Sequence, residues 1–186
     1  MKTRFLLGFN KLNIYGQAVL AGSKGILFFQ SYNKQFSEHR IKDIASVIQS
    51  IGAVGTTIRE GDVGGMAFST SAGSKELMVE VVRSPEHVLL VLVNIHASGY
   101  SNLVCHTGVT DRHWTFHPLK VDSVTLSLSS APGVTSLTNW REAVDGKLGP
   151  LDSVTVKDES GSVELSSIEM SDNVPVRLFV ADVKST

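Results

Sequence analysis

The sequence has little cysteine, little net charge and no long apolar run. Cys105 is the only cysteine, so no disulfide can form within the chain; this leans toward a reducing, cytoplasmic compartment without identifying one. With 17 basic and 18 acidic residues, the net charge of −1 gives no electrostatic reason to expect nucleic acid or an anionic membrane as a partner. No segment approaches the roughly 20 apolar residues of a membrane helix, and Asn10 ends the first apolar run before the roughly 7–15 residues of a signal peptide. We therefore expect a soluble protein with no nucleic-acid or membrane partner.

What is present suits a folded chain, because 42% of the residues are hydrophobic and 19% are charged.

The first 55 residues predict a helix, a strand and a second helix. Residues 12–21 contain helix formers, and residues 24–30 (KGILFFQ) form a continuous apolar run that is typical of a strand buried on both faces. Ser37 offers an N-cap for a helix over 38–51, which is expected to end at Gly52. The apolar residues of this second helix recur at spacings of three and four and so share one face: Ile41, Ile44, Ala45, Ile48 and Ile51.

From about residue 75 the apolar residues follow a period of two, which is typical of strands. In residues 121–128 they alternate at Val124, Leu126 and Leu128, so one face of that strand is expected to be buried. The predicted strands are 76–83, 87–95, 113–117, 121–128, 134–138, 152–157, 162–169 and 175–182, and turns are expected at 131–133, 148–150 and 158–161.

These patterns predict a mainly β fold. Residues 75–186 are expected to form an antiparallel β-sandwich, because short strands separated by turns are typical of that architecture. Residues 56–74 are rich in glycine and predict a loop-rich connection. Residues 1–55 form the α-β-α segment that precedes it.

Residues 15–30 (YGQAVLAGSKGILFFQ) resemble the last βα unit of a (β/α)8-barrel glycoside hydrolase. In many such enzymes a helix ends in a small-residue turn, and the eighth strand that follows finishes with aromatic residues and a polar residue near the sugar. An amphipathic helix and a small β-sandwich then complete the chain, which is the order predicted here. The resemblance implies a C-terminal accessory region, in which the sandwich braces the barrel.

The resemblance implies no catalytic residue within this chain. A complete barrel takes about 200–250 residues, whereas about 55 residues precede the sandwich region here. The family's paired carboxylates, which cleavage needs at about 5–10 Å from each other, would therefore fall upstream of Met1. Gln30 and Tyr32 occupy the strand end where the family contacts sugar, although ordinary loop residues after a buried strand would give the same pattern.

No metal site or cofactor is predicted from the histidines and the cysteine. His113 and His117 are four residues apart in a predicted strand, which would separate them by roughly 13 Å, too far for one zinc ion. His96 and the pair Cys105-His106 add ligand types without a recognisable spacing. Because neighbours on a strand point to opposite faces, Cys105 next to His106 is a poor candidate for an activated nucleophile.

Trp114 and Trp140 are the two tryptophans and admit two interpretations. Exposed indole rings could stack on sugars, whereas buried ones would contribute a large apolar area to the core. Trp114 would share a strand face with Phe116, opposite the polar His113 and Thr115, which favours the core.

Three functions fit the sequence. The first is the accessory region of a glycoside hydrolase, without activity by itself. The second is a stand-alone carbohydrate- or protein-binding sandwich with residues 1–55 as a docking element, and the third is a purely structural module. In every case the strand over 24–30 cannot cover both its faces or pair both its edges alone. We therefore expect self-association, or a missing barrel partner, through residues 1–55.

Overall fold

The computed structural model describes residues 49–50, 52–104, 110–171, 174 and 176–186. The helix predicted at 12–21, the strand predicted at 24–30 and the helix predicted at 38–51 up to residue 48 lie outside the described residues. Gly52, which was expected to end the second helix, and Ala53 are both helical, so the predicted end at Gly52 is wrong. For the strands between residues 97 and 116 the backbone alone is described. No helix in this described part of the chain is both long and apolar enough to cross a bilayer.

The described residues form one short helix, one 3₁₀ turn and twelve strands after residue 54. In chain order these elements are α3 (Gly55–Glu60), β1 (Asp62–Val63), β2 (Phe68–Thr70), β3 (Leu77–Arg83), β4 (His87–Asn94), β5 (Ala97–Val104), β6 (Thr110–Phe116), β7 (Leu119–Ser127), η1 (Leu128–Ser130), β8 (Val134–Val144), β9 (Lys147–Pro150), β10 (Thr155–Glu159), β11 (Ser162–Met170) and β12 (Val176–Ser185).

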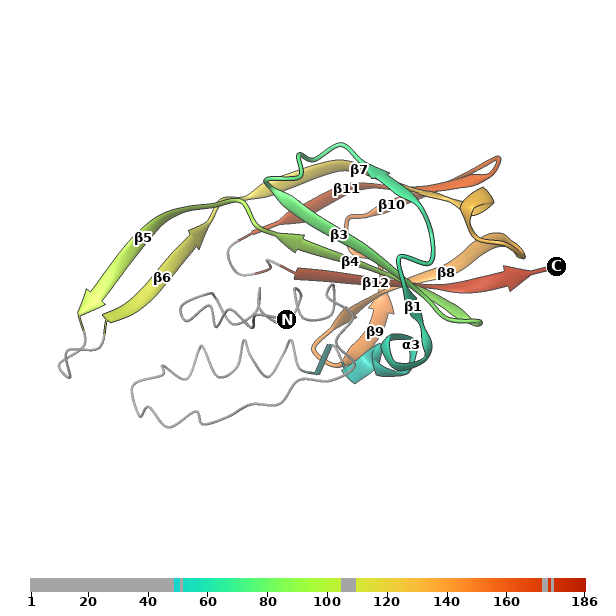
Figure 1. The fold of residues 1–186 in the computed structure, drawn as a ribbon, viewed down its shortest axis with the longest axis horizontal. Coiled ribbons are helices and arrows are strands. Elements are labelled where there is room, and N and C mark those ends of the chain that lie inside the picture. Colours follow the sequence, from blue (N-terminus) through green and yellow to red (C-terminus); the bar gives the residue numbers. More distant parts are fainter. Residues whose placement is uncertain (1–48, 51, 105–109, 172–173, 175) are drawn as a thin grey trace, which may run out of the picture.

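The strands form two facing sheets and a separate ribbon. The six-stranded sheet has the order β1-β3-β4-β12-β8-β9, and the four-stranded sheet has the order β10-β11-β7-β2. Every pairing between the described strands is antiparallel, so the predicted antiparallel sandwich is confirmed. The hairpin of β5 and β6 pairs with no other described strand and extends beyond the sandwich (Figure 1).

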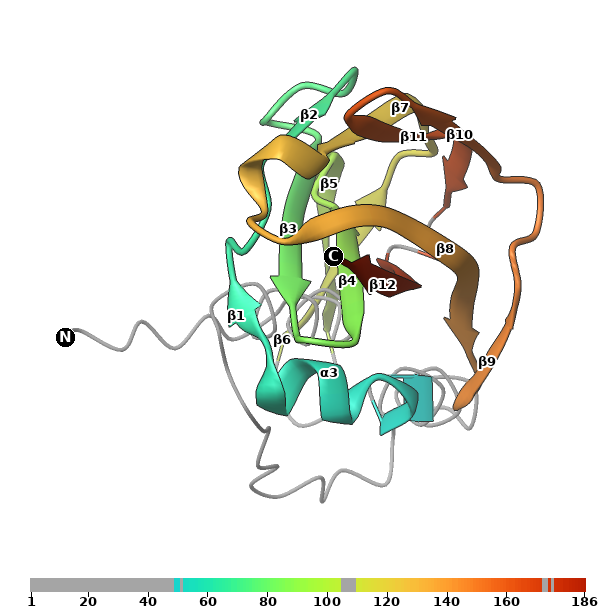
Figure 2. The same cartoon turned by 90° about the vertical axis from the view of Figure 1, so that its right-hand side faces the viewer.

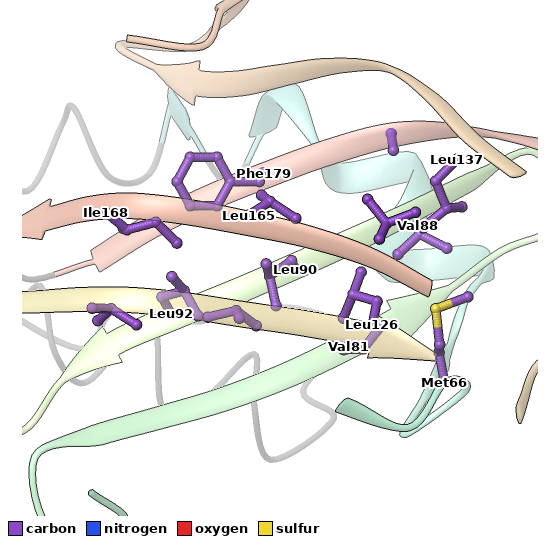
Figure 3. Close-up of a cluster of buried hydrophobic side chains, with 14 of the residues drawn as sticks. Met66, Val81, Val88, Leu90, Leu92, Leu126, Leu137, Leu165, Ile168 and Phe179 are labelled. Carbon is purple, nitrogen blue, oxygen red and sulfur yellow. The ribbon is translucent and has the colours of Figure 1, made fainter. Parts of the chain in front are cut away.

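The main hydrophobic core lies between the two sheets. The alternation predicted for 121–128 is confirmed, because Val124, Leu126 and Leu128 of β7 and η1 are buried there. The six-stranded sheet contributes Leu90 and Phe179 from its two central strands (Figure 3). Each such fully buried side chain contributes roughly 1.5–3 kcal/mol relative to exposure.

A second hydrophobic cluster lies on the opposite face of the six-stranded sheet, which we call the outer face. β4 is a continuous apolar run, and its alternate side chains enter the two clusters: Val88, Leu90 and Leu92 the main core, and Leu89, Val91 and Val93 the outer face. α3 packs on the outer face through Ile58, with Val54 just before its first turn. Figure 2 shows the resulting order: the four-stranded sheet, then β3, β4 and β12, then α3.

The turns differ from the predicted ones at one place. Residues 148–150 were predicted to form a turn, which is wrong because they belong to β9. The turn before β9 is Asp145-Gly146, with φ angles of 49° and 79°. Two successive positive φ angles are what a tight two-residue hairpin requires, and Asp-Gly is a preferred sequence for it. The predicted turn at 158–161 is confirmed, with Gly161 at φ 83° joining β10 to β11.

The glycine-rich stretch from 56 to 74 holds more regular structure than the predicted loop. It contains most of α3 together with β1 and β2, which form short outer strands of the two sheets. Gly61 explains part of the composition: a Cβ added there would lie 2.5 Å from the Thr57 carbonyl oxygen, closer than any side chain tolerates. The backbone therefore needs glycine to pass between α3 and β3.

Candidate functional site

Three polar clusters stand out among the described residues, and all join residues distant in sequence. None contains three or more His, Cys, Asp or Glu side chains placed to hold a metal ion within the part of the chain that is described. One lies at the base of the β5–β6 hairpin, and the other two are charged clusters of the six-stranded sheet.

The first cluster, which we call the neck, lies where the hairpin leaves the sandwich. Asn94 is fully buried at the end of β4; its Nδ2 donates to the His117 carbonyl oxygen at 2.8 Å, and its Oδ1 accepts from the His96 backbone N–H at 2.9 Å. The imidazole rings of His96 and His117 have their centroids 4.7 Å apart. Glu76 Oε1 lies 4.0 Å from His96 Nδ1. One amide thus fixes both strands of the hairpin at their base.

The neck brings together two histidines that sequence spacing did not pair. In the sequence His117 is four residues from His113, whereas the structure places His117 beside His96, 21 residues earlier. The His117 N–H also donates to the His96 carbonyl oxygen at 2.8 Å, so the two residues continue the ladder of the hairpin. A prediction that β5 and β6 form a hairpin would have revealed this proximity, but β5 was not predicted because its sequence, ASGYSNLV, lacks alternation.

The second cluster surrounds Asp182 on the outer face. The Asp182 carboxylate accepts from Arg141 Nη2 and, at 2.8 Å, from Asn139 Nδ2, and it lies 3.5 Å from His87 Nε2. Asp182 and His87 are directly opposite each other in the pairing of β12 with β4. The side chains of Asp182, His87 and Arg141 are half-buried, and Asn139 is exposed. They lie beyond the apolar part of the outer face, so that face changes from apolar to polar along β12.

The third cluster is a buried ion pair between the sheets. Arg177 Nε and Nη2 donate to the two carboxylate oxygens of Glu142 at 2.7 and 2.6 Å. The Arg177 guanidinium also donates to the backbone carbonyls of Glu169 and Asp152 at 3.3 Å and lies 4.9 Å from the centroid of the Phe179 ring. Since Glu169 belongs to β11 of the four-stranded sheet, the pair ties one sheet to the other.

These clusters do not form an acid–base pair. Glu142 and Asp182 are each occupied by an arginine, and they project to opposite sides of the six-stranded sheet: Glu142 lies opposite Phe179 of the main core, and Asp182 follows Val180 of the outer face. Two carboxyl groups on opposite faces of a sheet cannot flank one glycosidic bond. Glu142 and Asp182, each paired with an arginine, contribute to packing and to the alignment of neighbouring strands.

The residues predicted to contact sugar are scattered or lie outside the described part. Gln30 and Tyr32 lie outside the described residues. Trp114 belongs to β6, where its Cα pairs with that of Tyr100. Trp140 of β8 is half-buried and packs against the main core, and its buried indole N–H has no hydrogen-bond partner among the described residues. The two tryptophans belong to different sheets, Trp114 to the β5–β6 ribbon and Trp140 to the six-stranded sheet.

Comparisons with known proteins found little. No protein-family model and no curated protein matches the chain. Among solved structures, the chain is similar to a glycoside hydrolase family 30 subfamily 8 xylanase from Clostridium acetobutylicum, with 12% identity over 98% of this chain and 42% of that one and a TM-score of 0.41. The chain therefore spans less than half the length of that protein.

Proposed function

We propose that this chain is the C-terminal accessory region of a glycoside hydrolase-like protein and has no catalytic activity by itself. The motif over residues 15–30 supports the kinship, and the confirmed antiparallel sandwich supplies the domain that is expected to follow such a motif. In this role residues 1–55 provide the end of a barrel, and the sandwich braces it.

The apolar outer face of the six-stranded sheet is the observation that carries the proposal. In a free-standing sandwich each sheet packs one face on the core and turns the other to water, so its strands alternate apolar and polar residues. Here Leu89, Val91, Leu178 and Val180 on the outer face are as buried as the residues of the main core. A sheet that is apolar on both sides is suited to the middle of a layered assembly, which is the position of an accessory sandwich against a barrel.

The bracing role also agrees with the charged clusters. The Arg177–Glu142 pair links the two sheets, and the Asp182 cluster links β12, β8 and β4. Networks of this kind fix the relative positions of strands when every member is satisfied. They supply rigidity rather than proton transfer.

A direct test is to incubate the purified chain with a panel of aryl glycosides, alongside an active barrel hydrolase as the control for the assay. We expect no turnover above the buffer blank. Turnover that follows the chain through successive purification steps would refute the claim that it is inactive alone.

Sequencing the genomic DNA upstream of the first codon tests the kinship, which predicts an in-frame barrel-coding region there.

A binding experiment distinguishes the alternative of a stand-alone carbohydrate-binding module. The accessory role predicts no glycan-array binding that depends on the two tryptophans. Binding that is lost in both Trp114→Ala and Trp140→Ala, with the fold retained by circular dichroism, would replace the accessory role with that alternative.

A further inference from the structure

The outer edge of β3 is only partly covered by another described strand. β3 pairs with β4 along its whole length, from Leu77 to Arg83, whereas β1 pairs with the other edge of β3 at Val82 and Arg83 (Figure 2). The Gly64 N–H adds one bond, to the Val81 carbonyl oxygen at 2.8 Å, and the chain turns away at Gly64, which has a φ of 74°. The edge from residue 77 to residue 81 therefore has no neighbouring strand within the described part of the chain.

The main-chain groups that point to this open edge belong to alternate residues. In an antiparallel pair, successive residues direct their N–H and C=O groups to opposite sides of the strand. The Ile95 N–H donates to the Glu76 carbonyl oxygen at 2.8 Å, so the even-numbered residues that follow in β3 bond with β4. Val79 and Val81 consequently present their N–H groups at the open edge.

Glu80 occupies one of these two N–H groups. Its Oε1 accepts from the Val81 N–H at 3.1 Å and lies 3.9 Å from the position that a Cβ on Gly64 would take. The pairing of Val63 with Val82 would, if continued, place Gly64 opposite Val81, and the Val81 N–H would donate to the Gly64 carbonyl oxygen. The carboxylate therefore takes the place of a strand that ends there.

Glu80 is also a charged residue in an apolar row. Met78 and Val82, two positions to either side of it in β3, lie against or within the outer-face cluster, and Val91 opposite it belongs to the same cluster. Packing on this face would favour an apolar side chain at position 80. A charge directed toward the apolar side of an edge strand is one of the means by which natural sheets avoid pairing edge to edge.

We propose that Glu80 guards the open edge of β3 against pairing with the same edge of a second copy of this chain. A second copy fits because the open stretch is complementary to itself: about a two-fold axis through Val79, each copy would set its Val79 N–H against the Val79 carbonyl of the other. The Val81 N–H of each copy would then face the Leu77 carbonyl of the other, and the Glu80 carboxylate blocks this second kind of bond. The guard belongs to the sandwich itself and does not depend on the proposed function.

Light scattering of the full chain and three variants tests the guard. The variants are Glu80→Ala, the double variant Glu80→Ala with Val79→Pro, and Glu164→Ala. Because a pairing through a few main-chain bonds is expected to be weak, the concentration series extends to about 1 mM. Proline at position 79 removes an N–H that points to the open edge and leaves the bonds with β4 in place. Glu164→Ala removes the same charge from β11, which has a strand on both sides, and is the matched control.

We expect the mass of Glu80→Ala to rise with concentration above that of the unmodified chain, toward twice its value, and the mass of Glu164→Ala to follow the unmodified chain. Association through residues 1–55 is common to all four proteins, so the difference in mass reports the edge. Adding Val79→Pro should remove the excess. Since Val79 packs against the main core, this second change also lowers stability, and association of unfolded chains would increase rather than disappear. A mass of Glu80→Ala equal to that of the unmodified chain, or an excess that persists in the double variant, would overturn the proposal.

Discussion

At the scale of single residues, Glu142 and Arg177 are two opposite charges buried between the two sheets. Both side chains are 8% exposed, and their bidentate contact satisfies both carboxylate oxygens. Removing one partner from such a pair leaves a charge that is neither solvated nor neutralised, which costs far more than losing an exposed ion pair.

The first prediction is therefore that Glu142→Ala lowers the free energy of unfolding by roughly 3–5 kcal/mol. Glu60→Ala is the matched control, because Glu60 is paired with Arg59 at an exposed site and should change stability by less than about 1 kcal/mol. Urea unfolding of both variants measures the difference. Equal small losses would show that the Arg177–Glu142 pair is solvated.

The second residue-scale prediction concerns Asn94 at the neck. Asn94→Ala removes one donor and one acceptor that hold His117 and His96, and it leaves those backbone groups without the amide. We expect a loss of about 1–3 kcal/mol and faster hydrogen exchange in the β5–β6 hairpin. Glu76→Ala at the exposed side of the same neck serves as control and should leave the exchange rates of β5–β6 unchanged. Unchanged exchange in Asn94→Ala would mean that the hairpin is held by other contacts.

The candidate site could not be predicted from the sequence, for a reason visible in these residues. Glu142 and Arg177 are 35 positions apart, and Asp182 meets His87 across 95 positions. No local spacing links them, because the sheet order alone makes them neighbours. Trp140 shows a second limit, because a sequence pattern does not say whether an indole packs inward. In the structure its side chain packs against the main core and its indole N–H is buried.

At the scale of elements, strands with clean alternation were predicted well and short or irregular ones were missed. β7 and β11 bury every second side chain against the core over most of their length, and the periodicity of their sequences predicted both. β1, β2 and β9 have two to four residues, too few for any period to appear. Asp145-Gly146 was a recognisable hairpin signal that the prediction passed over in favour of Leu148-Gly149-Pro150.

A third prediction compares two glycines of these elements. Gly161 has φ 83°, and Gly149 is not in the left-handed region; a Cβ on either would meet nothing within 4 Å. The two sites therefore have equal room for a Cβ atom and differ in backbone conformation. Gly161→Ala should destabilise the chain by about 1–2 kcal/mol, whereas Gly149→Ala should be neutral or stabilising by up to about 1 kcal/mol. The difference in urea midpoint between the two variants measures the strain, and an equal midpoint would contradict it.

At the scale of the whole molecule, the described residues form a sandwich whose larger sheet has two apolar faces. The sequence predicted a doubly covered strand at 24–30, which lies outside the described residues, while β4 has that same continuous apolar pattern and is indeed buried on both sides. The prediction of a simple sandwich did not include the second face, because a run such as HVLLVLVN shows double burial without showing what lies on each side.

The fourth prediction is that the isolated chain self-associates through residues 1–55. A strand over 24–30, as the sequence predicts, cannot cover both its faces or pair both its edges alone, and open strand edges recruit further strands. Light scattering should report a mass above 20.1 kDa that increases with concentration. A monodisperse monomer at every protein concentration measured would count against the interpretation of residues 1–55 as the end of a barrel.

The double covering of the six-stranded sheet is tested most directly by truncating two neighbouring leucines of β4. Leu90 lies in the main core and Leu89 on the outer face, and both are fully buried. Urea unfolding should show that Leu89→Ala and Leu90→Ala each lose roughly 2–5 kcal/mol, while Val144→Ala, at an exposed position of β8, loses less than about 1 kcal/mol. The contradicting result is a loss of unfolding free energy in Leu89→Ala as small as that in Val144→Ala, together with the full loss in Leu90→Ala. The outer face of the sheet would then not be covered.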